Sequence, residues 1–211
     1  MKGERFCAVI GDINGSRELP DRIKIQRKFH RAIEIINAEY KKDIASKFVL
    51  TLGDEFQGLL ASATDSYRLA RRFQDIMGQI PFAFGIGIGG ISTRLNPKGT
   101  MDMDGECFHR ARAALLCAKK AKRSVVFDFE SSGLSLVNAV IASMEKGWKL
   151  LNPTQKQIVD LMKLYSHQET VAKKLNITQQ YVSKAMRTTI MQEMNEAENA
   201  LREFLSSHLQ Q

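Results

Sequence analysis

The first 128 residues alternate short apolar runs with stretches of helical spacing. Phe6–Ile10 is a continuous apolar run behind a charged start, which is typical of a central strand. From Asp21 to Tyr40 apolar residues recur every three or four positions, and Pro20 and Asp21 stand where a helix N-terminus favours them. Segments 48–52 and 55–60 flank Gly53-Asp54 and predict a β-hairpin.

A second helix and a glycine-rich strand follow. Thr64 is the expected cap of the helix, whose buried face would carry Leu69, Phe73, Ile76 and Ile80. In the strand over 82–91, glycines 85, 87 and 89 share one face, so a backbone, a helix or a ligand must pack closely there. An alanine-rich helix from Gly105 to about 120 and a strand over 124–127 complete the order βαββαβαβ. We therefore predict an α+β sandwich with helices over an antiparallel or mixed sheet.

Beyond residue 130 the pattern is helical only. A connecting helix runs to Leu150, and Asn152-Pro153-Thr154 combines a break with the cap of a new helix. These signals divide the chain into a domain over 1–128, a connecting helix over 129–152 and an all-α domain over 153–211.

The last domain has the spacing of a helix-turn-helix. A helix over 154–165 precedes segment 168–185, in which Asn176 suits a left-handed turn position and Thr178 can cap the next helix. This layout resembles that of bacterial transcription regulators. Residues 178–189 would then form the recognition helix.

Double-stranded DNA is the expected partner of this domain. The side chains expected in the major groove are Gln179, Gln180, Ser183, Lys184 and Arg187. Lys173 and Lys174 are expected to contact phosphates. Alternatively, the helical hairpin packs against the first domain or another protein and does not meet DNA.

Composition and charge narrow the class of protein. The 211 residues are 44% hydrophobic and 26% charged, as in an ordinary globular protein, and the formal net charge of +8 favours an anionic partner. No stretch is apolar enough to span a membrane, and the start has no secretion signal. Cys7, Cys107 and Cys117 have no metal-like spacing, so we expect buried or partly buried reduced thiols in a cytoplasmic protein.

Two acidic residues stand out in the first domain. Asp12 is expected just past the first strand and Asp54 at the tip of the hairpin. Both carboxylates would project at one sheet edge, where they suit Mg²⁺ or Mn²⁺ bound together with substrate phosphates. Each is also an ordinary turn residue, which is the alternative interpretation.

Four ordered segments resemble the motifs of class III nucleotide cyclases. Residues 6–16 are similar to the first strand of these enzymes, 50–54 to their Gly-Asp hairpin, and 84–90 to their glycine-rich fourth strand. Residues 102–111 resemble the loop and helix that carry their base-specifying and transition-state groups. Gly53-Asp54-Glu55-Phe56 is also similar to diguanylate cyclases.

The resemblance to the SatD family is closer still and covers roughly residues 5–128. It is carried by Asp12, Ser16-Arg17, Asp21-Arg22, residues 51–57, Gly85-Ile86-Gly87 and Asp104-Gly105.

The cyclase resemblance implies a set of site residues. Asp12, Ile13 and Asp54 would hold the metal, and Asn14, Gly15, Ser16 and Asp102 would bind nucleotide. Asp12, Asp54 and His109 are the implied catalytic residues. The chain departs from the cyclase pattern at three positions: Leu50 replaces a base-reading Lys, His109 a transition-state Asn, and Ala113 an Arg. Since stabilising the developing charge is usually the largest catalytic contribution, these departures argue against fast cyclisation.

These features together predict a cytoplasmic DNA-binding transcriptional regulator with a cation- and nucleotide-binding sensor domain. A divergent nucleotidyl cyclase or related phosphoryl-transfer enzyme is the alternative, and a third possibility makes both parts protein-interaction modules. We expect a homodimer, because cyclase-like domains usually pair. The tail 190–209 would either join two copies or cover its own module.

Overall fold

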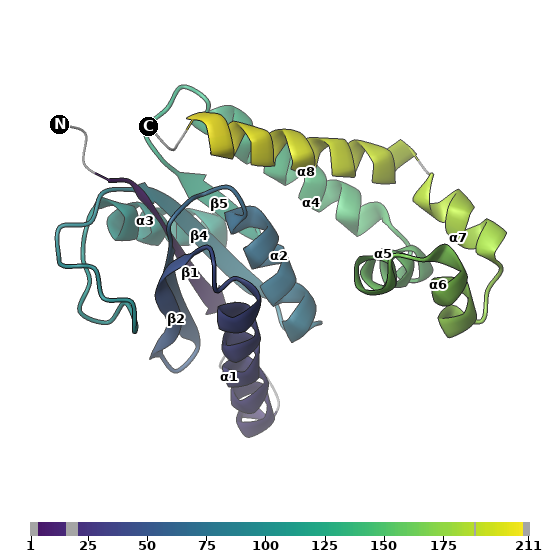
Figure 1. Cartoon of the computed structure of the whole chain (residues 1–211), viewed down its shortest axis with the longest axis horizontal. Coiled ribbons are helices and arrows are strands. Elements are labelled where there is room, and N and C mark those ends of the chain that lie inside the picture. The colour runs from purple at the N-terminus through teal and green to yellow at the C-terminus, as the bar shows by residue number, and fades with distance from the viewer. Residues whose placement is uncertain (1–3, 16–20, 188, 209–211) are drawn as a thin grey trace. The chain divides into compact units, whose positions relative to one another are not determined.

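Figure 1 shows the computed structural model, which describes residues 4–15, 21–187 and 189–208. The chain forms two compact units: Met1–Ala139 with Arg202–Gln211, and Val140–Leu201. We call them the α/β unit and the helical unit. The predicted boundaries at 128 and 152 remain a prediction. No helix in the described ranges has both the length and the apolarity needed to cross a membrane.

The α/β unit has the predicted order of elements. They are β1 (Phe6–Ile13), α1 (Arg22–Glu39), β2 (Ile44–Leu52), β3 (Glu55–Leu60), α2 (Ser66–Met77), β4 (Phe82–Gly89), α3 (Glu106–Ala121) and β5 (Val125–Asp128). The sheet order is β2-β3-β1-β4-β5, in which β4 and β5 are parallel and the other neighbours antiparallel. The predicted mixed α+β architecture is therefore confirmed.

Aromatic side chains join α1 and α2 to the sheet. Phe29 of α1 and Phe73 of α2 lie against Phe56 of β3, with ring centroids 5.7 and 4.3 Å from it. Phe82 and Phe84 of β4 extend the cluster. Burial of such large rings stabilises this half of the sandwich.

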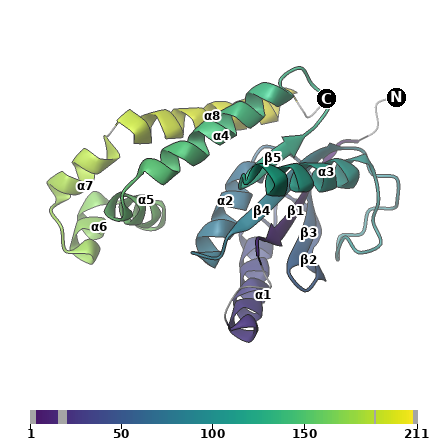
Figure 2. The same ribbon diagram turned by 180° about the vertical axis from the view of Figure 1, so that it is seen from behind.

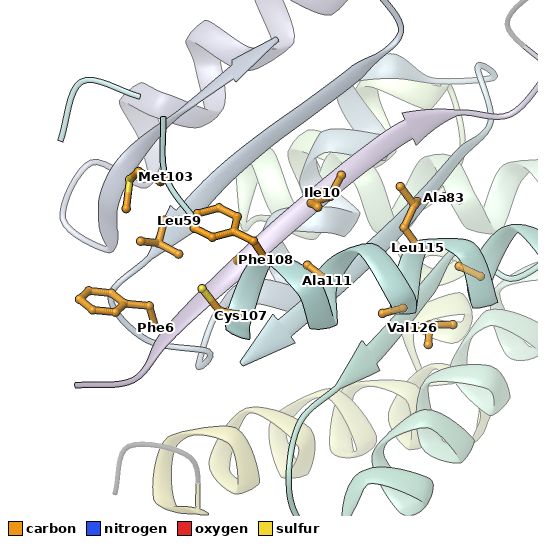
Figure 3. Close-up of a cluster of buried hydrophobic side chains, with 13 residues drawn as sticks. Phe6, Ile10, Leu59, Ala83, Met103, Cys107, Phe108, Ala111, Leu115 and Val126 are labelled. Atoms are coloured by element: carbon orange, nitrogen blue, oxygen red, sulfur yellow. The ribbon is translucent and has the colours of Figure 1, made fainter. Parts of the chain in front are cut away.

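The opposite side of the sheet is covered by α3. A Cβ added at Gly85 would lie 2.0 Å from the Ala111 carbonyl oxygen, and one at Gly87 would lie 2.2 Å from the Ala111 nitrogen. The glycines therefore let α3 approach the backbone of β4. Figure 3 shows the apolar side chains around this contact, including Phe6, Ile10, Cys107, Ala111 and Leu115. The predicted close neighbour of the glycine face is a helix.

Some local expectations need correction. The N-cap of α2 is Asp65, one residue after the predicted Thr64, whose hydroxyl lies 2.7 Å from the Ser62 hydroxyl. Ile80 lies beyond the end of α2. Asp21 does cap α1, accepting a hydrogen bond from the Lys24 amide at 3.1 Å.

Five helices follow the sheet. They are α4 (Leu134–Leu150), α5 (Pro153–Tyr165), α6 (Gln168–Leu175), α7 (Gln179–Met186) and α8 (Thr189–His208), of which α4 begins and α8 ends in the α/β unit. Asn152 and Gln155 form a capping box before α5, with Pro153 in its first turn. Figure 2 shows α5, α6 and α7 following one another closely.

Candidate functional site

The hairpin and β1 bring three carboxylates to one edge of the sheet. Asp12 lies within β1 rather than past its end, and it stands directly opposite Glu55 of β3 in the antiparallel register. Asp54 occupies the hairpin tip, where its carbonyl oxygen accepts a hydrogen bond from the Ile13 amide at 3.1 Å. The structure thus brings together the two predicted acids and adds a third, Glu55.

Glu55 forms a bidentate ion pair with Arg112 of α3. Arg112 Nη2 lies 2.8 Å from Oε1, and Nη1 donates to Oε2. Thr51 Oγ1 also donates to Oε1, at 2.8 Å. Burial alone would raise the pKa of Glu55, whose side chain is only 5% exposed, but the bonds from Arg112 and Thr51 and the nearby positive charges lower it overall. Glu55 is therefore held as a carboxylate.

Asp12 is paired with Lys119, near the end of α3. Lys119 Nζ donates to Asp12 Oδ2, and the two side chains are 37% and 14% exposed. Burial is the main cause that raises the pKa of Asp12; Lys119 opposes the rise, while Asp54 and Glu55 add to it. Lys119 is the first of four basic residues near the end of α3, Lys119, Lys120, Lys122 and Arg123, and its contact with Asp12 brings it to the sheet edge. We call Asp12, Asp54, Glu55, Arg112 and Lys119 the carboxylate network.

In this arrangement the network does not fit a divalent cation. Carboxylate oxygens are the ligands that Mg²⁺ prefers. However, Lys119 occupies one oxygen of Asp12, and Arg112 engages both oxygens of Glu55. Within the described ranges, no group of three or more His, Cys, Asp or Glu residues is placed to hold a metal ion. The implied Mg²⁺ or Mn²⁺ site at Asp12, Ile13 and Asp54 therefore remains a prediction.

The other predicted nucleotide residues are less closely gathered. The Asn14 amide donates to the Pro81 carbonyl at 2.9 Å, and Gly15 has a positive φ of 68°. Ser16 lies outside the described residues. Asp102 is exposed in the loop before α3. His109 is 74% exposed and pairs with Asp104 at 3.1 Å, which is not part of the network.

Sequence reasoning missed the roles of Arg112 and Lys119. Arg112 is one position away from the cyclase Arg, a shift that turns a helical side chain by about 100°. The available signal was the spacing of the two residues, because positions seven apart on a helix lie on nearly the same side. That side is the one that faces the carboxylates.

The predicted turn between α6 and α7 has the expected geometry. Asn176 ends α6 in the left-handed conformation (φ 52°, ψ 45°), and the Thr178 hydroxyl caps α7 by accepting from the Tyr181 amide at 3.1 Å. The shared core of α5, α6 and α7 consists of Ile158, Val171, Ala172, Val182 and Ala185. One face of α7 is thereby buried.

The remaining face of α7 carries the predicted DNA-binding side chains. Gln179, Gln180 and Lys184 are exposed on α7. Arg187 is exposed at its C-cap, since the helix ends at Met186 and not at 189 as predicted. Ser183 is half-buried and accepts a hydrogen bond from Arg187 Nη2 at 2.7 Å. On α6, Lys173 pairs with Glu169 at 2.9 Å, and Lys174 Nζ lies 4.5 Å from the centre of the Tyr165 ring.

Comparison with solved structures finds cyclase domains. The catalytic core of a rhodopsin-guanylyl cyclase with converted specificity, in complex with ATPαS, is 18% identical at a TM-score of 0.40, covering 55% of this chain and 73% of that one. A bacterial light-regulated adenylyl cyclase is 13% identical at 0.42, covering 64% and 79%. The guanylate cyclase domain of RhGC from Catenaria anguillulae, in complex with GTP, is 15% identical at 0.40, covering 55% and 74%. No curated protein matches the chain.

The family comparison covers much more of the sequence. The SatD family model matches residues 6–201, which include strands β1 to β5 and helices α1 to α7. The chain therefore belongs to the SatD family.

Proposed function

We propose that this chain is a DNA-binding transcriptional regulator that reads base edges with α7. The observation that carries the proposal is the division of α7 into two faces: Val182 and Ala185 are buried, while Gln179, Gln180 and Lys184 are exposed. Glutamine suits the adenine edge and arginine the guanine edge in the major groove.

The connection between α6 and α7 supports the same proposal. Three residues join the helices, and the left-handed Asn176 with the capping Thr178 fixes the direction in which α7 leaves the turn. A recognition helix must be held in this way by its partner helix if its side chains are to meet base edges in a defined register.

Phosphate contacts would come from the end of α6. Lys173 and Lys174 are exposed there, and the overall charge of +8 favours a polyanionic partner. The ion pair of Lys173 with Glu169 is itself exposed, so it contributes little and is easily exchanged for a phosphate.

We further propose that the α/β unit senses a nucleotide or a similar anionic ligand. Such a ligand regulates DNA binding only if its affinity differs between two states of the protein. The homodimer remains a prediction. Leu201 and Leu205 of α8 are already buried within the single chain, which argues against their use in joining two copies.

The test uses selection from a randomised pool of DNA duplexes with the full chain. We expect wild-type protein to enrich a sequence motif, and the Gln180→Ala and Arg187→Ala variants to lose enrichment at separate base positions by about 1–3 kcal/mol each. Lys149→Ala, which changes an exposed lysine at the end of α4, is the matched control. Absence of enrichment by the wild type, or unchanged motifs in both the Gln180→Ala and the Arg187→Ala variant, would refute the proposal.

The salt dependence of DNA affinity distinguishes side chains that contact phosphates from side chains that contact base edges. Lys173→Ala and Lys174→Ala should weaken binding to all sequences alike and reduce the slope of log K against log salt by about 0.9 for each phosphate that is no longer neutralised. A change confined to one sequence would contradict their proposed role.

A second candidate function is a divergent nucleotidyl cyclase or related phosphoryl-transfer enzyme. It is favoured by the convergence of Asp12 and Asp54 at one sheet edge, and it requires that Lys119 leave Asp12 when a cation binds. Its test is incubation with each ribonucleoside triphosphate and Mg²⁺ or Mn²⁺, with products separated by chromatography. Turnover that disappears in both Asp12→Asn and Asp54→Asn would establish this candidate, and absence of product would exclude it for these substrates.

A further inference from the structure

The two cations of the carboxylate network come from one side of one helix. Arg112 and Lys119 are seven residues apart on α3, nearly two full turns. Their partners, Glu55 and Asp12, face each other across two neighbouring strands. Each cation therefore meets its own carboxylate, and the pairs lie side by side.

The packing of α3 holds both cations in place. Gly85 and Gly87 allow the backbone of α3 to lie directly on β4, so the helix cannot rotate or slide without steric conflict. The α3 residues that make this contact, Cys107, Ala111 and Leu115, are buried. The backbone positions of Arg112 and Lys119 are consequently held in place relative to the sheet edge.

The charges of the network nearly cancel. With every group ionised, Asp12, Asp54 and Glu55 supply three negative charges, and Arg112 and Lys119 supply two positive ones. A divalent cation approaching Asp12 would meet little net attraction and would also be repelled by the Lys119 ammonium.

From this geometry we infer that Lys119 is a tethered counter-ion that takes the place of a divalent cation at Asp12 and closes the sheet edge to metal. An ammonium is a compact point charge on a flexible stem, so it can neutralise a carboxylate that would otherwise bind a metal. The inference concerns the α/β unit alone and is independent of whether α7 binds DNA.

The experiment measures Mn²⁺ binding to the full chain by electron paramagnetic resonance, in which free Mn²⁺ gives the signal. We expect weak binding by the wild type and at least about tenfold tighter binding by Lys119→Met. An ammonium about 5 Å from a divalent ion repels it strongly enough to weaken binding about tenfold, even at the dielectric constant of water. Lys120→Met, at the exposed neighbour of Lys119, is the matched control and should bind as the wild type does.

A double variant assigns the gained site to Asp12. Asp12→Asn combined with Lys119→Met should lose the gain in Mn²⁺ affinity. Circular dichroism and thermal unfolding establish that each variant is folded, and Lys119→Gln replaces the methionine variant if that one is not. The inference is overturned if the wild type binds Mn²⁺ as tightly as Lys119→Met, or if the gain survives removal of the Asp12 charge.

Discussion

A methyl group added at Gly85 tests the contact that positions α3. In Gly85→Ala the new Cβ would lie 2.0 Å from the Ala111 carbonyl oxygen and 2.3 Å from the Leu115 nitrogen. Both neighbours are backbone atoms, so no side-chain rotation relieves the conflict. To reach an ordinary contact of 3.4 Å, the helix must move about 1.4 Å away from β4.

This displacement loosens the whole apolar contact beneath α3. Cys107, Ala111, Leu115 and Ala118 are each at most 1% exposed, so separating them from the sheet opens space that no other side chain fills. Overpacking in a well-packed core typically costs 1–3 kcal/mol, and a backbone-to-backbone conflict belongs at the upper end, about 3 kcal/mol. The same movement would draw Arg112 and Lys119 away from their carboxylates.

The assay is urea unfolding followed by far-ultraviolet circular dichroism, with hydrogen exchange of the β4 and α3 amides. The single tryptophan, Trp148, belongs to the helical unit, so its fluorescence provides an internal reference. Gly90→Ala is the matched control, because a Cβ there meets nothing within 4 Å and should change stability by no more than about 0.5 kcal/mol. If Gly85→Ala is as stable as Gly90→Ala, the close packing of α3 on β4 is refuted.

Two further predictions concern titratable side chains. Burial raises the pKa of Cys7 and of Cys107 to about 12, whereas Cys117 is exposed, so a maleimide should label one thiol in the folded chain and three in denaturant; labelling of folded Cys117→Ser at the wild-type rate would contradict this. Because the pKa of Glu55 is lowered in the folded state, its stabilising effect is present above its ordinary value of 4.5 and is lost as pH falls through the folded value. Arg112→Met should therefore lower stability near neutral pH by about 1–3 kcal/mol and flatten the loss of stability in acid, measured as urea midpoints against pH; parallel pH profiles for the two proteins would rule out this role of the ion pair.

Much of the fold follows from patterns within a few residues of sequence. The strand over Phe6–Ile10, the Gly53-Asp54 hairpin and the helix after Asp21 were each predicted from local spacing and capping, and each is present. The turn at Asn176 and the cap at Thr178 were predicted in the same way. Such features depend on backbone preferences and neighbours within one turn of helix, which the sequence displays directly.

The glycine face of β4 was predicted from the sequence, but the element that packs against it was not. Three glycines on one side of a strand demanded a close neighbour, but a helix, a backbone segment or a ligand would have satisfied the pattern equally well. Only the packing of α3 against β4 decided between them. A glycine in a strand indicates that another group approaches closely, but it does not indicate which group that is.

The ion pairs of the carboxylate network could be identified only from the tertiary structure. Asp12 and Asp54 were visible as candidate ligands, but their surroundings were not, because Lys119 is 107 residues from Asp12 and Arg112 is 57 from Glu55. These pairs require both the strand register and the height of α3 above the sheet, and each is set by packing of the whole unit. The sequence by itself determined which elements form and where charge is available; the tertiary structure decided which charges meet, because electrostatic pairing depends on distance in space and not on separation along the chain.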